Sequence, residues 1–267
     1  MQASWEKMRQ SPMLGQQLGQ VIILRGDARA LPLAGVGTLE AQKLTHILQT
    51  QLAAALRERA DYPKAAERVL LDQTHPQVGL QDALGGVLAG EGGQMLLSLR
   101  ANDVADLKPK TPLARPEKLI DIWLQSLAAA AMDQPCKCVV VGRNAVVRVP
   151  PQDPQAARAQ LQTLLATWAE GMRWPLPLPP GVALQWLKDP DNLNALADAY
   201  EGSEFKSAEK DKDPALARTY PTVEDLLATG ALDRLAQAVY APLKAWAAEA
   251  EVEVLPDASE DDEGEDA

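Results

Sequence analysis

Residues 86–100 read GVLAGEGGQMLLSLR, and this stretch predicts a β-hairpin. Two short apolar runs, 86–89 and 95–100, flank a glycine-rich polar tip at 90–94. Apolar runs bounded by turn residues in this way are typical of paired antiparallel strands. The hairpin is the reference point for the rest of the chain, because the segments around it decide what kind of sheet it joins.

A helix and a second hairpin are expected directly after residues 86–100. Apolar residues recur at helical spacing over about 116–132, and two extended runs at 137–141 and 145–149 enclose a Gly-Arg-Asn turn. The order of hairpin, long helix and second hairpin predicts a mixed α/β (α+β) fold, in which a small mixed sheet of hairpins is flanked by helices.

A long helix is also expected before the first hairpin, over 38–62, with Thr38 as its N-cap. The preceding Gly35-Val36-Gly37 predicts a turn leading into this helix rather than a phosphate loop, because no dinucleotide or P-loop motif continues from it. Pro-rich residues 174–180 cannot form helix. Further helices are expected at 155–171 (with Ala157, Leu161, Leu164, Leu165 and Trp168 inward), 181–188, 191–201, 222–228 and 232–249, and extended segments at 69–71 and 78–80.

Charge is unevenly distributed along the 267 residues. The formal net charge is −11, but seven of the acids lie in 257–267, so the remainder carries only −4. We therefore divide the chain into one domain, 1–256, with an N-terminal helical segment leading in, and a disordered acidic tail, 257–267. With no long apolar run and no signal peptide, a cytoplasmic protein is expected. The nearly balanced body neither indicates nor excludes DNA as a partner.

Cysteine and histidine do not suggest a metal centre. Cys136 and Cys138 are expected on opposite faces of one strand, and His46 and His75 are far away in the sequence. A zinc site needs four converging ligands, so none is expected.

The predicted order of elements resembles the core of nucleases of the PD-(D/E)xK class. In these enzymes an Asp on one strand and an Asp/Glu-x-Lys on the next gather a divalent metal. Hard oxygen ligands suit Mg²⁺, and the metal and lysine polarise the attacking water and the phosphate. A working site in residues 86–100 would therefore need carboxylates, and its apolar runs contain none.

Several stretches together resemble the C-terminal domain of the gamma subunit of exodeoxyribonuclease V, the RecC family. The most telling is 145–187, AVVRVPPQDPQAARAQLQTLLATWAEGMRWPLPLPPGVALQWL, which is similar to the family's strand ending in Pro-Pro, helix, Gly-Met exit and Trp-containing helix. The resemblance spans about 11–249. Its other landmarks are Ser11-Pro12, Leu31 to Gly37, Leu119 to Leu124, Ala199 to Gly202 and Tyr240 to Leu243.

The resemblance implies a nuclease-like domain without nuclease activity. In an active RecB-type nuclease the hairpin would carry Asp, Asp and Lys where this chain has Ala89, Ser98 and Arg100. We expect Ala89 and Ser98 to lie side by side on paired strands, with no metal between them. Leu119 and Trp123, which replace a Gln and a Tyr of active relatives, are expected in the core.

The resemblance also implies a function through partners. The family's complex, RecBCD, unwinds and degrades DNA in double-strand break repair and recombination. Within it the gamma subunit scaffolds and helps to separate the strands. The expected partners are RecB-like and RecD-like helicase and nuclease subunits and DNA, with no membrane. Mg²⁺ and ATP are expected to be used by those subunits and not by this chain. Because full members are several times longer, we expect a fragment, a truncated product or a split subunit.

Basic residues around the two hairpins are the candidate DNA contacts, since cationic side chains beside a nuclease-like cleft can hold phosphates. A metal-dependent nuclease using Asp103, Asp106 and Lys108 remains the alternative, and a protein-docking module without DNA contact is a third. Trp174 and Trp186 are expected to pack in the core rather than to stack on bases. The candidates are Arg100, Lys108, Lys110, Arg115, Arg143 and Arg148, and the apolar stripe expected to dock on partners is Leu232, Leu235, Val239, Leu243 and Trp246.

Overall fold

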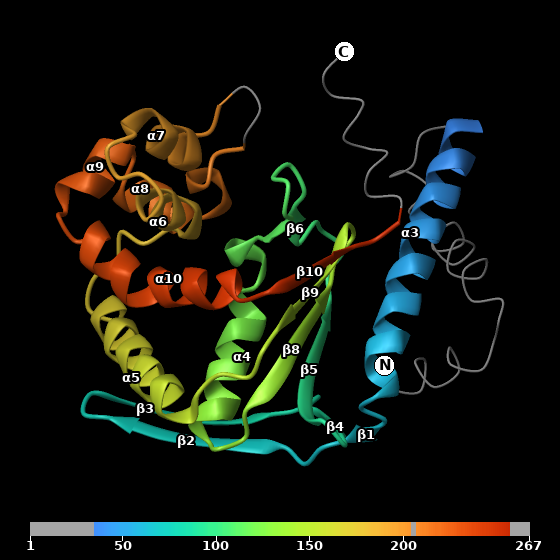
Figure 1. Ribbon diagram of the computed structural model, residues 1–267. Coiled ribbons are helices and arrows are strands. Elements are labelled where there is room, and N and C mark those ends of the chain that lie inside the picture. Colours follow the sequence, from blue (N-terminus) through green and yellow to red (C-terminus); the bar gives the residue numbers. More distant parts are fainter. Residues whose placement is uncertain (1–34, 204–206, 257–267) are drawn as a thin grey trace.

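The computed structural model describes residues 35–203 and 207–256, with side chains from residue 43 onward. The described part has three layers: helix α3 (Gly35–Ala60), a central sheet, and a group of helices on the opposite face (Figure 1). The acidic tail and the landmarks at 11–12 and 31–34 lie outside the described residues. No helix among the described residues has the length and apolar character needed to cross a membrane.

The central sheet has six strands in the order β1-β4-β5-β8-β9-β10. Every neighbouring pair is antiparallel except β5–β8, which is parallel. Parallel neighbours need a crossover connection, and α4 (Ile120–Ala131) provides it. The predicted order of hairpin, helix and hairpin is therefore confirmed. The strands are β1 (Lys64–Ala65), β4 (Leu88–Gly90), β5 (Gly93–Leu99), β8 (Cys136–Val141), β9 (Ala145–Val149) and β10 (Glu251–Val254).

Each face of the sheet packs on a different layer, because successive side chains on a strand point to opposite sides. Val139 and Val141 join Ala54 and Ala55 of α3 in one core cluster. Cys136, Cys138 and Val140 join the larger cluster under α4. The expectation that the two cysteines occupy opposite faces is wrong, since residues two apart on a strand share a face. Both thiols are free and buried.

The β4–β5 hairpin closes through Glu91 and Gly92, because Gly90 pairs directly with Gly93. Gly93 has a φ of +106°, a conformation that side chains rarely adopt. Gly90 lies against the chain that leaves α3: a Cβ added there would come within 1.9 Å of the carbonyl oxygen of Asp61. The tip of the hairpin is therefore fixed by packing.

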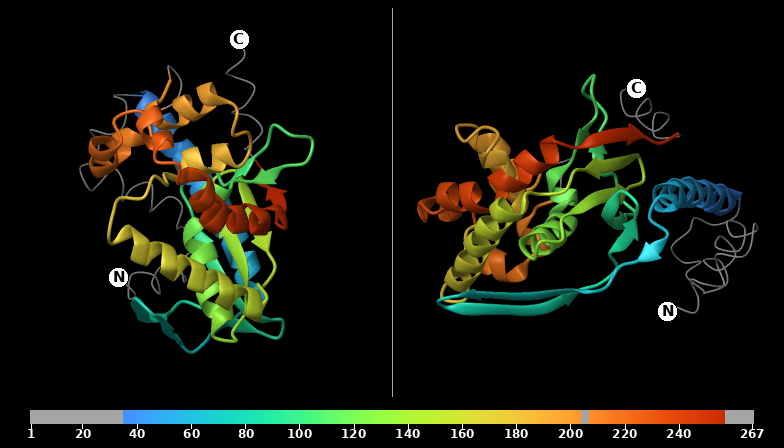
Figure 2. Two further views of the ribbon diagram at one scale, coloured as in Figure 1. Left: turned by 90° about the vertical axis from the view of Figure 1, so that its left-hand side faces the viewer. Right: turned by 60° about the horizontal axis from the view of Figure 1, so that its bottom comes forward.

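A separate two-stranded ribbon precedes this hairpin. Strands β2 (Val69–His75) and β3 (Val78–Leu84) pair along their full length, which confirms and extends the extended segments expected at 69–71 and 78–80. The ribbon runs beneath α4 and α5 (Pro154–Gly171), as the right-hand view of Figure 2 shows. Val69 and Leu71 bury their side chains in the larger core cluster.

Most predicted helices form, and several are capped by the polar residues that precede them. Asp153 accepts a hydrogen bond from the backbone of Ala156 at the start of α5, and Thr222 makes a capping box with Asp225. The short helix at Pro214–Thr219 and strand β10 were not predicted. The remaining elements are η2 (Pro116–Lys118), α6 (Pro180–Trp186), α7 (Leu193–Glu201), η3 (Lys210–Lys212), α8 (Pro214–Thr219), α9 (Val223–Ala228), α10 (Leu232–Ala248), β6 (Ala105–Asp106) and β7 (Leu113–Ala114).

Three details of the helices differ from the predictions. Helix α3 begins at Gly35, so the glycines expected in a turn are helical. Trp168, expected inward, is 52% exposed, because α5 packs through the Ala157, Leu161 and Leu165 side of the helix. The stripe on α10 expected to dock on partners is instead buried or half-buried in the chain's own core, so it is not a free surface.

Candidate functional site

The register of the hairpin separates the two positions expected to replace catalytic carboxylates. Ala89 pairs with Gln94, whereas Ser98 pairs with Val140 on β8. Ser98 lies four residues beyond Gln94 on β5, a distance of about 13 Å along the strand. The expectation that Ala89 and Ser98 lie side by side is therefore wrong. The two-residue turn is the cause, since it fixes the pairing partner of every residue in β4.

Arg100 follows β5 directly and is held on the α4 side of the sheet. Its Nη2 atom donates to Oδ2 of Asp121, in the first turn of α4, at 2.6 Å. Its carbonyl oxygen accepts from Nε2 of Gln51 on α3 at 2.8 Å, so the end of β5 is tied to both helical layers. The Nε atom of Arg100 is buried and has no hydrogen-bond partner within the described part of the chain.

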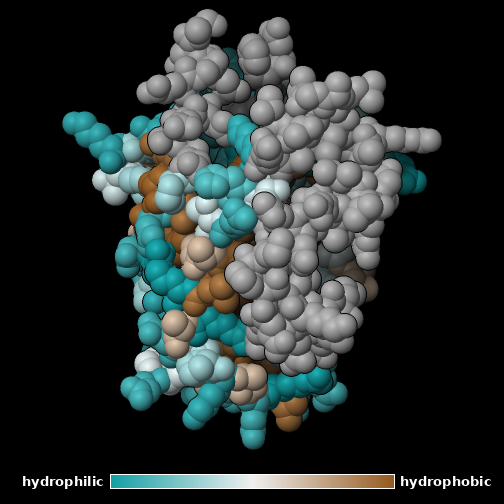
Figure 3. All heavy atoms as spheres, turned by 90° about the vertical axis from the view of Figure 1, so that its right-hand side faces the viewer, coloured by the Kyte–Doolittle hydropathy of each residue, from teal (hydrophilic) through white to brown (hydrophobic). Residues whose placement is uncertain are grey.

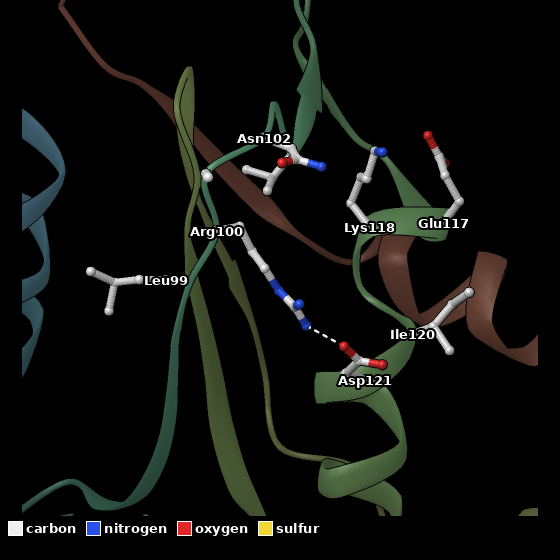
Figure 4. Close-up of a pocket in the computed structure, with 9 residues that line it drawn as sticks. Leu99, Arg100, Asn102, Glu117, Lys118, Ile120 and Asp121 are labelled. Carbon is white, nitrogen blue, oxygen red and sulfur yellow. Dashed lines mark hydrogen bonds and ion pairs between the residues drawn. The ribbon is translucent and has the colours of Figure 1, made fainter. Parts of the chain in front are cut away.

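A pocket of about 410 Å³ opens beside Arg100, between the end of β5 and the start of α4 (Figure 4). Asn102, Glu117, Lys118 and Asp121 supply its polar groups. Figure 4 shows Arg100 extending down toward Asp121, with Asn102 above Arg100 and Lys118 rising on the opposite side. The volume lies within the range of small-molecule sites, about 300–1,000 Å³.

The acids of this pocket are already neutralised by arginines. Glu117 accepts from Nε of Arg115 at 2.8 Å, and Asp121 accepts from Arg100. For the side chains of Lys118 and Asn102, by contrast, the structure shows no ion pair or hydrogen bond with any described residue. The groups of the lining without a described partner therefore include the donors of Lys118 and Asn102.

Asn144 organises the loop that leads into the pocket, a role that was not predicted. It is buried in the β8–β9 turn, accepts from the backbone of Val104 at 3.0 Å and donates to the carbonyl of Ala105 at 2.9 Å. The neighbouring Arg143 makes two hydrogen bonds of 2.8 Å to Asp103. The sequence did contain a signal for this role, since an Asn in a turn between two strands commonly forms hydrogen bonds with nearby backbone groups.

The loop proposed as an alternative nuclease site lies on a separate small sheet. Asp106 ends β6, which pairs with β7, so it occupies a short strand. Its Oδ1 accepts from the backbone of Lys108 at 3.1 Å, and Asp103 is engaged by Arg143. Within 35–203 and 207–256 no three His, Cys, Asp or Glu side chains are grouped as metal ligands would be. Lys108 and Lys110 are exposed near this loop.

Arg148 lies on the other face of the sheet, under α3. It bonds to Glu58 of α3 and to Glu251 and Glu253 of β10, and its side chain is only 13% exposed. The hydrogen bond from Arg148 lowers the pKa of Glu58, and the same guanidinium lowers the pKa of Glu253. Arg148 is therefore committed to an internal ionic cluster, and we leave it out of the DNA interface proposed below.

The aromatic and thiol groups singled out in the sequence have packing roles. Leu119 and Trp123 are buried in the core, as predicted. Trp186 packs partly against the core and donates from Nε1 to Asp233 at 3.0 Å, and Trp174 is half-buried. Burial raises the pKa of Cys136 to about 11 and that of Cys138 to about 12, so both remain neutral thiols.

Comparison with known protein families identifies the domain. A family model described as the RecC C-terminal domain matches residues 10–190, from before α3 to the end of α6. The chain belongs to this family. In the RecC-type domain seen here, the match includes the central sheet up to β9, both hairpins and the pocket beside Arg100. The landmarks at 199–202 and 240–243 lie beyond the matched range. A search of curated proteins found no match.

Proposed function

We propose that the chain is a non-catalytic DNA-processing subunit, or part of one, of a RecBCD-type helicase and nuclease complex that repairs and recombines broken duplexes. The observation that carries this proposal is the family match over residues 10–190. In this role the chain scaffolds the complex and helps to separate the strands, while the chemistry takes place in its partners.

A nuclease-like core that has lost its metal site is the second part of the proposal. Its support is the sheet itself, in which a hairpin, a crossover helix and a second hairpin follow the order typical of PD-(D/E)xK enzymes. Ala89 and Ser98 have no carboxylate, and Arg100 stands where such enzymes have a lysine. Because an arginine repels Mg²⁺ and attracts phosphate, this end of β5 is suited to holding DNA rather than cutting it.

The partners and cofactors in this proposal come from the family. RecB-like and RecD-like subunits use ATP and Mg²⁺, and this chain holds neither. The complex acts in the cytoplasm. Of the basic residues around the hairpins, Arg100, Arg115, Lys108, Lys110 and Arg143 remain the proposed phosphate contacts, although Arg100, Arg115 and Arg143 also pair with acids of the chain.

A cleavage assay separates this proposal from a metal-dependent nuclease. The isolated chain should not cut single-stranded or duplex DNA at any Mg²⁺ concentration. If cleavage is found, Asp106→Ala and the matched variant Asp72→Ala, at an exposed aspartate of the β2–β3 ribbon, identify its source. Cleavage lost only in Asp106→Ala would overturn the non-catalytic role.

A binding assay separates it from a docking module that never touches DNA. A subunit that contacts phosphates should bind DNA more weakly as salt rises, because counterions are released on binding. Absence of salt-dependent DNA binding by the chain, alone and together with its partners, would favour the docking module.

A further inference from the structure

The pocket beside Arg100 is bordered by three donor groups for which the described residues provide no partner. The Nε atom of Arg100 is buried without a hydrogen-bond partner among the described residues, a state that costs free energy unless a ligand relieves it. The side chains of Asn102 and Lys118 line the same cavity from its other walls. Three donors around one cavity of about 410 Å³ are an arrangement that suits an anion with several acceptor oxygens.

The charges around the cavity also favour an anion over a cation. Asp121 and Glu117 are the acids of its lining, and each is paired with an arginine, at 2.6 Å and 2.8 Å. Lys118 is left with no ion pair to any residue that the structure describes. The lining itself holds two cations and two acids, and Arg115, which pairs with Glu117 from outside the lining, adds one further positive charge beside the cavity. Helix α4 also begins here without a side-chain cap, and its first turn adds the positive end of a helix dipole.

We propose that this pocket is a phosphate-binding site, in which Lys118, Asn102 and the guanidinium of Arg100 hold one phosphate group of a nucleic-acid strand. The inference rests on the proposed function, which supplies DNA as the partner, and it assigns the contact to a defined cavity. Lys118 and Asn102 are new members of the site, since the sequence singled out neither. Asp121 accepts from Nη2 of Arg100 and holds the guanidinium beside the cavity.

The test measures binding of a short single-stranded DNA to the full chain at several salt concentrations. Lys118→Ala should weaken binding about tenfold, as expected for loss of one charged hydrogen bond. It should also reduce the slope of log K against log salt by about 0.7, the value for one phosphate contact on a single strand. Lys118→Arg should restore both. The matched control is Lys64→Ala, an exposed lysine on the far edge strand β1, which should change neither.

Two further arms identify the source of the phosphate. A strand with a 5′-phosphate and the same strand with a 5′-hydroxyl should bind equally if the pocket holds a backbone diester. Tighter binding of the phosphorylated strand, with competition by inorganic phosphate, assigns the pocket to a strand end. Either result supports a phosphate site.

The pocket and the proposed function fail in different ways. If Lys118→Ala and Lys64→Ala bind DNA alike while the wild-type chain binds in a salt-dependent manner, the pocket inference is wrong and the proposed function stands. If the wild-type chain binds neither oligonucleotide nor inorganic phosphate, the pocket inference is also overturned. Circular dichroism of each variant confirms that a loss of binding does not reflect unfolding.

Discussion

The guanidinium of Arg100 has one nitrogen paired with an acid and one nitrogen without a described partner. Its Nη2 atom is paired with Asp121, whose side chain is 64% exposed, while its Nε atom has no partner among the described residues. An exposed pair of this kind contributes little to stability, typically about 0–1 kcal/mol. The guanidinium can therefore contact a ligand at little cost to the fold.

Opposite effects are predicted for the two partners of this pair. Arg100→Ala should weaken DNA binding by a similar factor for every sequence, because a phosphate contact does not read bases. Asp121→Asn removes a negative charge from the same pocket and should strengthen binding by about threefold. Fluorescence titration with DNAs of different sequence measures both.

The control for these variants is Glu91→Gln, which removes the same charge at the exposed tip of the hairpin. It should change binding less than Asp121→Asn does. Equal effects of the two acidic variants, or a sequence-dependent effect of Arg100→Ala, would contradict a phosphate contact at this position.

Single positions in the site could be predicted only in part from the sequence. Arg100 was predicted at the end of the hairpin as a candidate DNA contact; the structure places it beside the pocket, and the DNA contact stays a prediction. The positions of Ala89 and Ser98 relative to each other were wrong, because pairing depends on the length of the turn, and one residue of slip changes every partner. Lys118 and Asp121 were missed because their role comes from the crossover of α4 beside β5, a contact between distant elements.

The β4–β5 hairpin is held in place by close packing at its tip. Gly90→Ala would bring a Cβ within 1.9 Å of the carbonyl oxygen of Asp61, which is backbone and cannot rotate away. We predict a loss of about 2 kcal/mol in the free energy of unfolding, a typical cost of overpacking. Chemical denaturation measures it. Gly85→Ala is the matched control, since a Cβ there meets nothing within 4 Å, and an equal loss in both variants would contradict this packing.

Helix α3 is attached to the sheet by charge as well as by apolar contact. Glu58 of α3 bonds to Arg148 of β9, which also bonds to Glu253 of β10. The exposed leucines of α3 do not belong to the small core cluster that contains Ala54 and Ala55. They are Leu44, Leu48 and Leu56. The face of the molecule that carries α3 accordingly shows hydrophobic side chains among hydrophilic ones (Figure 3).

This ionic cluster predicts a loss of stability in acid. The pKa of Glu58 and of Glu253 is lower in the folded chain than its ordinary value, so the unfolded chain binds protons more readily. Their contribution is complete at neutral pH and disappears as the pH falls through the folded-state pKa. Glu58→Gln should cost about 2 kcal/mol at neutral pH and much less in acid. Thermal unfolding across pH measures this, and a pH-independent cost would contradict it.

Elements with a strong local pattern were predicted, and those defined by distant contacts were not. Apolar runs or helical periodicity predicted the two hairpins, α4, α5 and α10, and the structure contains each of these elements. Strand β10 has only four residues, with charged and apolar residues alternating beside an acidic tail, and it forms because β9 offers a free edge. Pattern alone also could not tell whether the stripe on α10 faces a partner or the chain's own core, and the structure places it in the core.

At the scale of the molecule, the residues that the family model matches are also those that build most of the central sheet. Residues 10–190 include the sheet up to β9, and the helices that follow, together with β10, complete the layer opposite α3 and the edge of the sheet. The site proposed for DNA lies at one end of the sheet, where β5 and the first turn of α4 meet. The proposed function requires this domain to hold a strand at that end without cutting it.

The most direct test of this account is ATP-dependent unwinding of duplex DNA by a complex assembled with and without this chain. The complex contains RecB-like and RecD-like subunits and, if the chain is one part of a split subunit, the segment that precedes it. We predict that the chain co-purifies with these subunits and that unwinding is lost without it. Assembly and unwinding at the same rate in its absence would contradict the account.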